Sequence, residues 1–135
     1  MGTISLSELR KALQNAWDRE TCYPELRSKW DSALPEIGQC AVTALIVQEN
    51  LGGKIAFNKC KDHFWNVLPK GKHIDLTKKQ FKDNGKLGID SYVPREAILR
   101  SKSAEKQQTL HRYQILKKKV IKNLSHNPSF AISNP

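Results

Sequence analysis

The sequence contains no long apolar run and nothing that resembles a secretion signal. No window approaches the roughly 20 apolar residues that a membrane-spanning helix needs. The first residues, Met1 to Ser5, lack the charged-then-apolar order of a signal peptide. We therefore expect a cytoplasmic chain that has no membrane partner.

Cysteine is also scarce, and its three copies, Cys22, Cys40 and Cys60, form no CxxC pair. An odd and scattered set excludes the disulfide framework of a small secreted domain, so we expect reduced thiols. Cys60 and His63 could join a zinc site, but the second pair of ligands that a structural site requires is missing. We therefore expect no metal and no cofactor.

Acidic residues are outnumbered, since 13 Asp and Glu face 23 Lys and Arg, which gives a net charge of +10. The positive excess lies in residues 54–135, whereas residues 1–53 carry more acidic than basic groups. Such a distribution suits nucleic acid, an acidic protein partner or an anionic surface, and it also serves solubility alone. Charge by itself does not choose among these functions.

The clearest secondary-structure signal is a buried helix in the middle of the chain. Residues 41–47 are all apolar or small, a run too long for most strands, and Gly52-Gly53 stops it. Cys40 would lie in the first turn of that helix. The sequence therefore predicts a cysteine at a helix N-terminus.

Other segments complete an expected α+β fold. Ser5 and Glu8 form a capping box, which predicts a helix over residues 6–18. The remaining expectations are an irregular or short helical segment over 19–37, helices over 77–84, from Pro94 and over 104–124, and strands over 54–58, 63–68, 73–77 and 89–93. These elements predict a single compact domain over residues 1–124, with the N-terminal helices and the cysteine-bearing helix packed on a small antiparallel sheet. A C-terminal helix and a flexible tail over 125–135 would follow.

The turn between the second and third strands decides which side chains share a face of the sheet. A two-residue loop would put Asp75 on the opposite face from His63. A three-residue loop, Pro69-Lys70-Gly71, pairs Leu68 with Lys72 and puts Asp75 diagonal to His63 on one face. Proline suits the start of a type I turn and glycine the left-handed position after it. We therefore predict the three-residue loop.

In that register Cys40, His63 and Asp75 would form a nucleophile, a base and an orienting carboxylate. A helix N-terminus and an imidazolium both stabilise a thiolate, which is the reactive form of cysteine. A carboxylate behind the imidazole fixes its tautomer and orientation. Each residue also has an ordinary explanation: Cys40 as a buried thiol, His63 as a surface histidine, and Asp75 as a cap for a helix that begins near Thr77. The agreement of helix start, strand and turn favours the triad.

Further motifs surround these three residues. They are Trp17, Glu20-Thr21, Gly38 to Leu45, Gly52-Gly53, His63 to Asn66, Asp75 to Thr77 with Gln80-Phe81, and Arg112-Tyr113 with Leu116. The triad order resembles the transglutaminase-like branch of the papain-like cysteine enzymes, and the whole set resembles the small YunG-like bacterial proteins. This resemblance implies a papain-like or transglutaminase-like fold, with Cys40 as nucleophile, His63 as general base and acid, and Asp75 as the orienting carboxylate. It implies no settled activity.

Two features depart from the pattern of the enzyme superfamily. The spacings from Cys40 to His63 and from His63 to Asp75 are short, which predicts a minimal sheet, and Ala41 stands where transglutaminase-like proteins have tryptophan. The backbone N–H of Cys40 is a natural oxyanion donor. The other candidates for substrate or oxyanion contacts are Gln39, Trp65, Asn66 and Trp30.

We therefore expect a thiol enzyme that performs acyl transfer or amide hydrolysis through a thioester, as a peptidase, deamidase or transglutaminase-like protein. Its substrate would be an unidentified protein or amide. The alternative is a non-enzymatic interaction module that binds nucleic acid or an acidic partner through the basic C-terminal two-thirds. The chain lacks a known nucleic-acid motif, so that partner is less favoured. A third hypothesis is a degenerate enzyme fold that keeps the triad residues and acts as a toxin, effector or partner-binding protein.

Overall fold

The computed structural model describes residues 4–78 and 87–125. The elements follow the chain as helix α1 (Leu6–Gln14), the 3-10 helix η1 (Pro24–Lys29), helix α2 (Cys40–Leu51), strands β1 (Lys54–Asn58), β2 (His63–Val67), β3 (His73–Ile74) and β4 (Ser91–Tyr92), and helices α3 (Arg95–Arg100), α4 (Lys102–Lys106) and α5 (Thr109–Ser125). The fold is therefore α+β, as the sequence predicts. No helix in the described part of the chain is both long and apolar enough to span a membrane.

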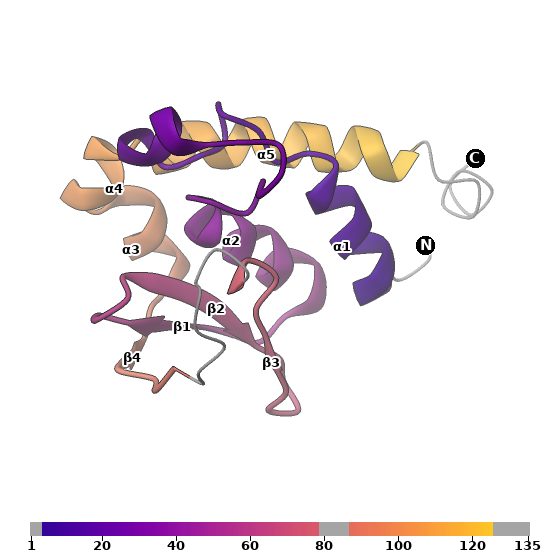
Figure 1. Ribbon diagram of the computed structural model, residues 1–135. Coiled ribbons are helices and arrows are strands. Elements are labelled where there is room, and N and C mark those ends of the chain that lie inside the picture. Colours follow the sequence, from indigo (N-terminus) through magenta and orange to yellow (C-terminus); the bar gives the residue numbers. More distant parts are fainter. Residues whose placement is uncertain (1–3, 79–86, 126–135) are drawn as a thin grey trace.

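Helix α2 is the centre of the molecule. Residues 42–47 of this helix are all buried, because α2 lies between the sheet on one side and α5 on the other (Figure 1). Its apolar side chains join those of α1 and α5 in one core, which contains Leu9, Leu13, Leu45 and Leu116, each fully buried. An apolar helix of this kind is stable only when neighbours cover it on all sides.

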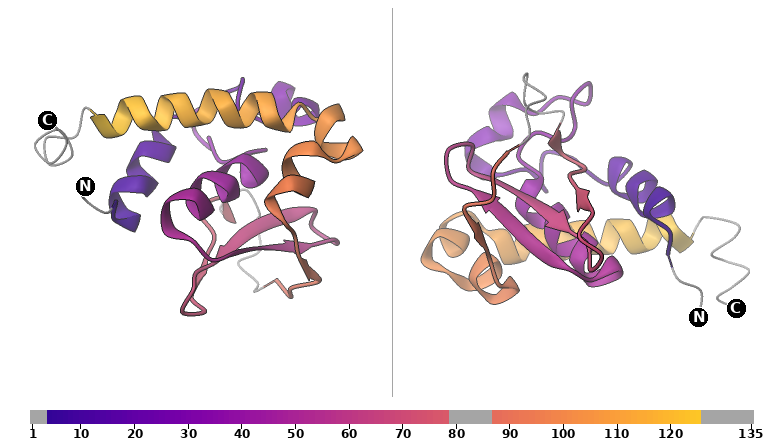
Figure 2. Two further views of the ribbon diagram at one scale, coloured as in Figure 1. Left: turned by 180° about the vertical axis from the view of Figure 1, so that it is seen from behind. Right: turned by 90° about the horizontal axis from the view of Figure 1, so that it is seen from below.

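The helices around α2 gather at two ends of the molecule. Both views of Figure 2 place α3 and α4 at one end and α1 at the other, with α5 running between them. At the α1 end, the side-chain amide of Asn123 in α5 donates to the carbonyl of Ala12 in α1 at 2.9 Å. The two ends of α5 are thus attached to different parts of the fold.

The sheet has the strand order β3-β2-β1-β4, and its pairs are antiparallel. The predicted strand over 54–58 is confirmed with those bounds. The pairing of Asn66 with Ile74 and of Val67 with His73 continues to Leu68, whose N–H donates to the carbonyl of Lys72 at 2.8 Å. The three-residue loop is therefore confirmed.

Gly71 has the positive φ that this loop requires, at 90°. Its N–H donates to the carbonyl of Leu68 at 2.8 Å and closes the turn. Because side chains alternate along a strand, this register puts His63, Trp65 and Asp75 on one face and Phe64 and Asn66 on the other.

Several predicted bounds were too generous. Helix α1 ends at Gln14, not at residue 18. The chain turns after it, and the indole N–H of Trp17 donates to the hydroxyl of Thr43 in α2 at 2.8 Å. Strand β3 ends at Ile74, because the next residue, Asp75, leaves the ladder to bond His63. The expected strand over 89–93 is reduced to β4, and Pro94 precedes α3 as its cap.

The predicted helix over 104–124 is wrong as a single element. It is divided into α4 and α5 by Gln107 and Gln108, and Gln108 has a positive φ of 58°. The carbonyl of Gln107 accepts from the Nε of Arg112 at 3.0 Å instead of continuing a helix. The short helix predicted over 77–84 and the tail over 125–135 lie mostly outside the described residues.

Candidate functional site

Cys40 is the first residue of α2, as predicted, and its side chain is half-buried. The chain enters the helix through Gly38, whose φ is +71°. A Cβ at Gly38 would lie 2.5 Å from the sulfur of Cys22 and 2.9 Å from the backbone nitrogen of Tyr23. Only glycine fits this approach, since any larger residue would both strain the backbone and clash. The start of α2 is therefore set by close packing.

Polar side chains hold the first turns of α2 in place. The amide nitrogen of Gln39 donates to the carbonyl of Asp18 at 3.0 Å. The amide of Asn66 in β2 donates to the carbonyl of Ala44 at 2.9 Å. The first bond is partly buried and the second is fully buried, and together they fix the position of the helix against the loop before it and against the sheet.

The imidazole of His63 is bound to the carboxylate of Asp75. The Nε2 of His63 lies 2.7 Å from Oδ2 of Asp75, and the two side chains are 0% and 21% exposed. The other oxygen, Oδ1, accepts from the backbone N–H and the hydroxyl of Thr77 at 3.2 and 3.4 Å. Asp75 is thereby anchored on both oxygens, so it both caps the following turn and orients the imidazole.

Cys40 interacts with the same imidazole. Burial alone would lower the pKa of His63, but its hydrogen bonds and electrostatic interactions with Asp75 and Cys40 outweigh burial and raise that pKa from 6.5 to about 9. Because Nε2 is bound to Asp75, Nδ1 is the ring nitrogen that can exchange a proton with the thiol of Cys40. The structure therefore brings the three predicted residues into one cluster.

Trp65 supports the imidazole from its own strand. Its ring is stacked against that of His63, with centroids 6.0 Å apart and planes at 17°. Its indole N–H donates to Nδ1 of His73 at 3.1 Å, which holds the ring in place. Trp65 is buried, and its stacked ring limits the orientations that the imidazole of His63 can take.

The remaining candidates of the sequence have other contacts in this structure. Asn66 lies on the face of β2 opposite His63 and binds α2. The indole of Trp30 donates to the carbonyl of Pro35 at 3.1 Å, and the guanidinium of Arg19 lies 5.6 Å from its ring. Neither set of contacts includes a member of the cluster.

Gln39 is fully buried, and its amide orientation is set by the carbonyl of Asp18, which can only accept. The amide oxygen that is left has no partner among the described residues, and it is an acceptor. In this arrangement an oxyanion donor comes more readily from the backbone. The first backbone bond within α2 runs from Thr43 to Gln39, so the N–H of Cys40 has no acceptor inside the helix.

Arg112 is a buried residue near the site. In the sequence it belongs to a motif, but no chemical role was predicted for it. It is 1% exposed, and its Nη1 donates to the carbonyls of Thr21 and Gly38 at 3.1 and 3.5 Å. A signal was present, because Arg112 lies three residues after Thr109 and four before Leu116, on the inward stripe of α5. An arginine on such a stripe must find buried acceptors.

These features define an α+β protein with a cysteine, a histidine and an aspartate clustered where a buried helix meets a small antiparallel sheet. The chain belongs to the YunG family, because the family model described as YunG protein matches residues 5–125. This confirms the resemblance to YunG-like proteins.

A relative from Bacillus subtilis (strain 168), the uncharacterized protein YunG, is 33% identical over 78 residues. That match covers 56% of this chain and 63% of the relative, so it spans less than two thirds of the relative's length. No solved structure matches the chain significantly.

Proposed function

We propose that the chain is a thiol enzyme that acts on acyl or amide groups, with Cys40 as nucleophile, His63 as general base and acid, and Asp75 as the orienting carboxylate. The observation that carries the proposal is the 2.7 Å bond between Nε2 of His63 and Oδ2 of Asp75, on a fully buried imidazole that also interacts with Cys40. Nucleophile, base and orienting group in this relation are the general signature of nucleophilic catalysis.

The reaction would proceed in two stages. In the free protein the proton of the Cys40 thiol rests on His63, because the raised pKa of the imidazole keeps it charged at neutral pH. The thiolate then attacks the carbonyl carbon of the substrate to form a tetrahedral oxyanion. The imidazolium then gives its proton to the departing amine, which leaves a thioester on Cys40. Water or a second amine next attacks the thioester carbonyl while His63 takes a proton from it. The C–S bond then breaks, the acid or the new amide leaves, and Cys40 and His63 return to their starting state. Water gives hydrolysis or deamidation, whereas an amine gives crosslinking.

The finer assignment to a papain-like or transglutaminase-like fold belongs to the same proposal. It is supported by a cysteine at the start of a helix packed on an antiparallel sheet, with the histidine at the start of β2 and the aspartate directly after the neighbouring strand β3. The oxyanion would be stabilised by the backbone N–H of Cys40 and by the positive end of the α2 dipole. The short connection between β1 and β2 leaves the sheet minimal.

The test is the rate at which iodoacetamide labels each cysteine between pH 5.5 and 9, read by mass spectrometry. The chain carries its own controls, because Cys60 is exposed and Cys22 is buried. We expect Cys40 to react faster than Cys60 at pH 6.5, and we expect His63→Ala and Asp75→Asn to slow Cys40 but not Cys60. If Cys40 follows the pH profile of Cys60 in every variant, it is an ordinary thiol and the proposal is wrong.

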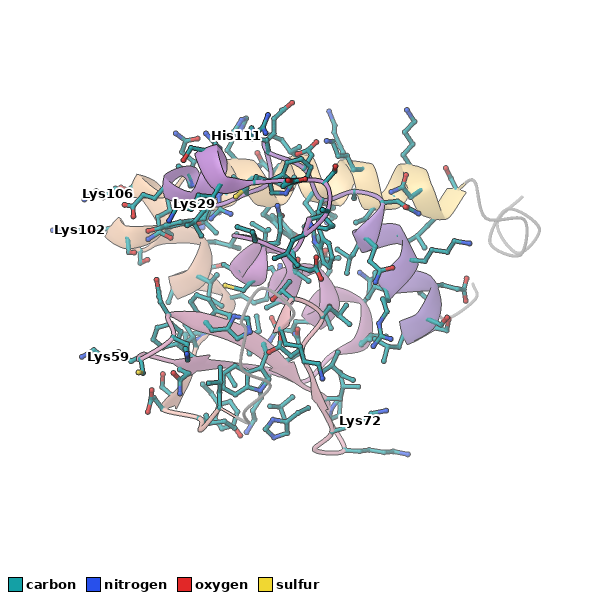
Figure 3. The ribbon with its side chains drawn as sticks, viewed as in Figure 1. Lys29, Lys59, Lys72, Lys102, Lys106 and His111 are labelled. Atoms are coloured by element: carbon teal, nitrogen blue, oxygen red, sulfur yellow. The ribbon has the colours of Figure 1, made fainter. Side chains whose placement is uncertain are left out.

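A second candidate is an interaction module for nucleic acid or an acidic partner. The observation that favours it is that Lys59, Lys102 and Lys106 are exposed and extend at the same end of the molecule (Figure 3). A true phosphate contact makes the affinity fall steeply with salt. Two results would count against this candidate. One is that the protein does not bind duplex DNA even at low salt, and the other is that the double variant Lys102→Glu, Lys106→Glu binds it as tightly as the natural sequence.

A further inference from the structure

Arg112 places a full positive charge inside the protein. Besides its two bonds to the carbonyls of Thr21 and Gly38, its Nε donates to the carbonyl of Gln107 at 3.0 Å and its Nη2 lies 3.5 Å from the hydroxyl of Thr109. Every one of these acceptors is electrically neutral. These contacts engage four of the five N–H groups of the guanidinium but leave its charge uncompensated.

Buried charges in proteins are normally paired with an opposite charge, because removing a lone ion from water is costly. Among residues 4–78 and 87–125, no carboxylate forms an ion pair with Arg112. Burial lowers the pKa of Arg112 to about 10, so the group is still charged at neutral pH. The other groups that act on its charge are Cys40, Cys22, Arg27 and Tyr23, and the ring of Tyr23 lies 5.9 Å from the guanidinium.

Of these four groups, only the two cysteines can supply a negative charge near neutral pH. Cys22 is fully buried, and burial raises the pKa of its thiol, so it stays neutral. Cys40 is half-buried at a helix N-terminus and interacts with His63, whose raised pKa lets the imidazole hold the proton that the thiol gives up. A thiolate at Cys40 is therefore the anion that best complements Arg112.

We propose that Arg112 is a positioning residue for Cys40, which holds the carbonyl of Gly38 two residues before the nucleophile and favours the thiolate through its uncompensated positive charge. The inference rests on the proposed function, because it assigns Arg112 a part in activating the same cysteine. It also explains why position 112, on the inward face of α5, is an arginine and not an apolar residue.

The first experiment compares three variants by the pH profile of Cys40 labelling. Arg112→Met removes the charge, and we expect it to move the midpoint of the profile upward by about one pH unit, roughly a tenfold loss of rate at pH 6.5. Arg112→Lys keeps the charge without the planar fork, so it should recover most of that rate. Thr109→Val removes one contact of Arg112 and keeps its charge, so it should lower stability without moving the profile.

A second measurement leaves Arg112 in place, in case Arg112→Met does not fold. The chemical shift of the Arg112 ¹⁵Nε nucleus is followed between pH 5 and 9 in the natural sequence and in Cys40→Ala. We expect a step in the natural sequence at the pH where Cys40 labelling rises, and we expect Cys40→Ala to lose it. A flat Arg112 signal in both proteins would overturn the inference, as would a folded Arg112→Met with an unaltered profile.

The two proposals fail in different ways. If His63→Ala slows Cys40 but neither Arg112→Met nor the Arg112 signal responds, the enzyme proposal stands and Arg112 is only a structural brace. If Cys40 is no faster than Cys60 in the natural sequence, the enzyme proposal fails first, and the Arg112 inference fails with it.

Discussion

At the scale of single residues, the orientation of the His63 imidazole depends on the two carboxylate oxygens of Asp75. One oxygen binds His63 and the other binds Thr77, so the carboxylate cannot rotate away from the imidazole without losing both contacts. This resolves two explanations that the sequence left open, since Asp75 caps the following turn and also orients the histidine. The cap is what makes the orientation rigid.

The first prediction concerns the charge state of His63. In Asp75→Asn the carboxylate charge is gone, burial opposes the imidazolium and only the contact with Cys40 still favours it, so we expect the pKa of His63 to fall below its value of about 9. The measurement is the ring ¹³Cε1 shift of His63 between pH 5 and 10, with the exposed His111 as a reference signal in the same spectra. An unchanged titration of His63 in Asp75→Asn would show that Asp75 does not hold its proton.

At the scale of elements, the start of α2 depends on one glycine. Gly38→Ala forces a side chain into a left-handed backbone and against the sulfur of Cys22, so we expect it to cost about 2 kcal/mol or more. Gly71→Ala meets only the backbone penalty, about 1 kcal/mol, because no atom lies within 4 Å of the added Cβ. Gly88→Ala, with open space and no positive φ, is the neutral control. Urea unfolding that ranks the three variants otherwise would contradict this account of α2.

The elements also show what the sequence can and cannot predict. The hairpin register was predictable because Pro69 and Gly71 specify the loop locally, and the register then determines which side chains share a face. The break before α5 was not predictable, because neither glycine nor proline marks it. Gln107 gives its carbonyl to Arg112, which in turn binds a loop more than 70 residues away. Tertiary contacts of this kind override the local helical preference.

The candidate site divides in the same way. Cys40, His63 and Asp75 could be found from helix start, strand alternation and turn type, each of which is local. The contacts of Gln39 and Asn66 could not, because their partners are backbone carbonyls whose positions exist only in the folded chain. For the same reason, the position of Arg112 on α5 indicates that the residue is buried, but it does not predict what the buried charge does.

At the scale of the whole molecule, the raised pKa of His63 makes stability depend on pH. A group whose folded pKa exceeds its unfolded value stabilises the fold fully below the unfolded value, here 6.5, and loses that effect as the pH rises through about 9. We therefore expect the free energy of unfolding to fall by up to about 3 kcal/mol between pH 6 and 9.5. Urea titrations of the natural sequence and of His63→Gln measure the difference.

The variant isolates the histidine, because the lysines and arginines of this basic chain titrate equally in both proteins. We expect His63→Gln to be less stable than the natural sequence at pH 6 and closer to it at pH 9.5. If the two stability curves run parallel across this range, His63 is not charged in the folded protein at neutral pH. The thiolate of Cys40 would then have only the dipole of α2 and Arg112 to favour it, and the imidazole would act as a neutral base.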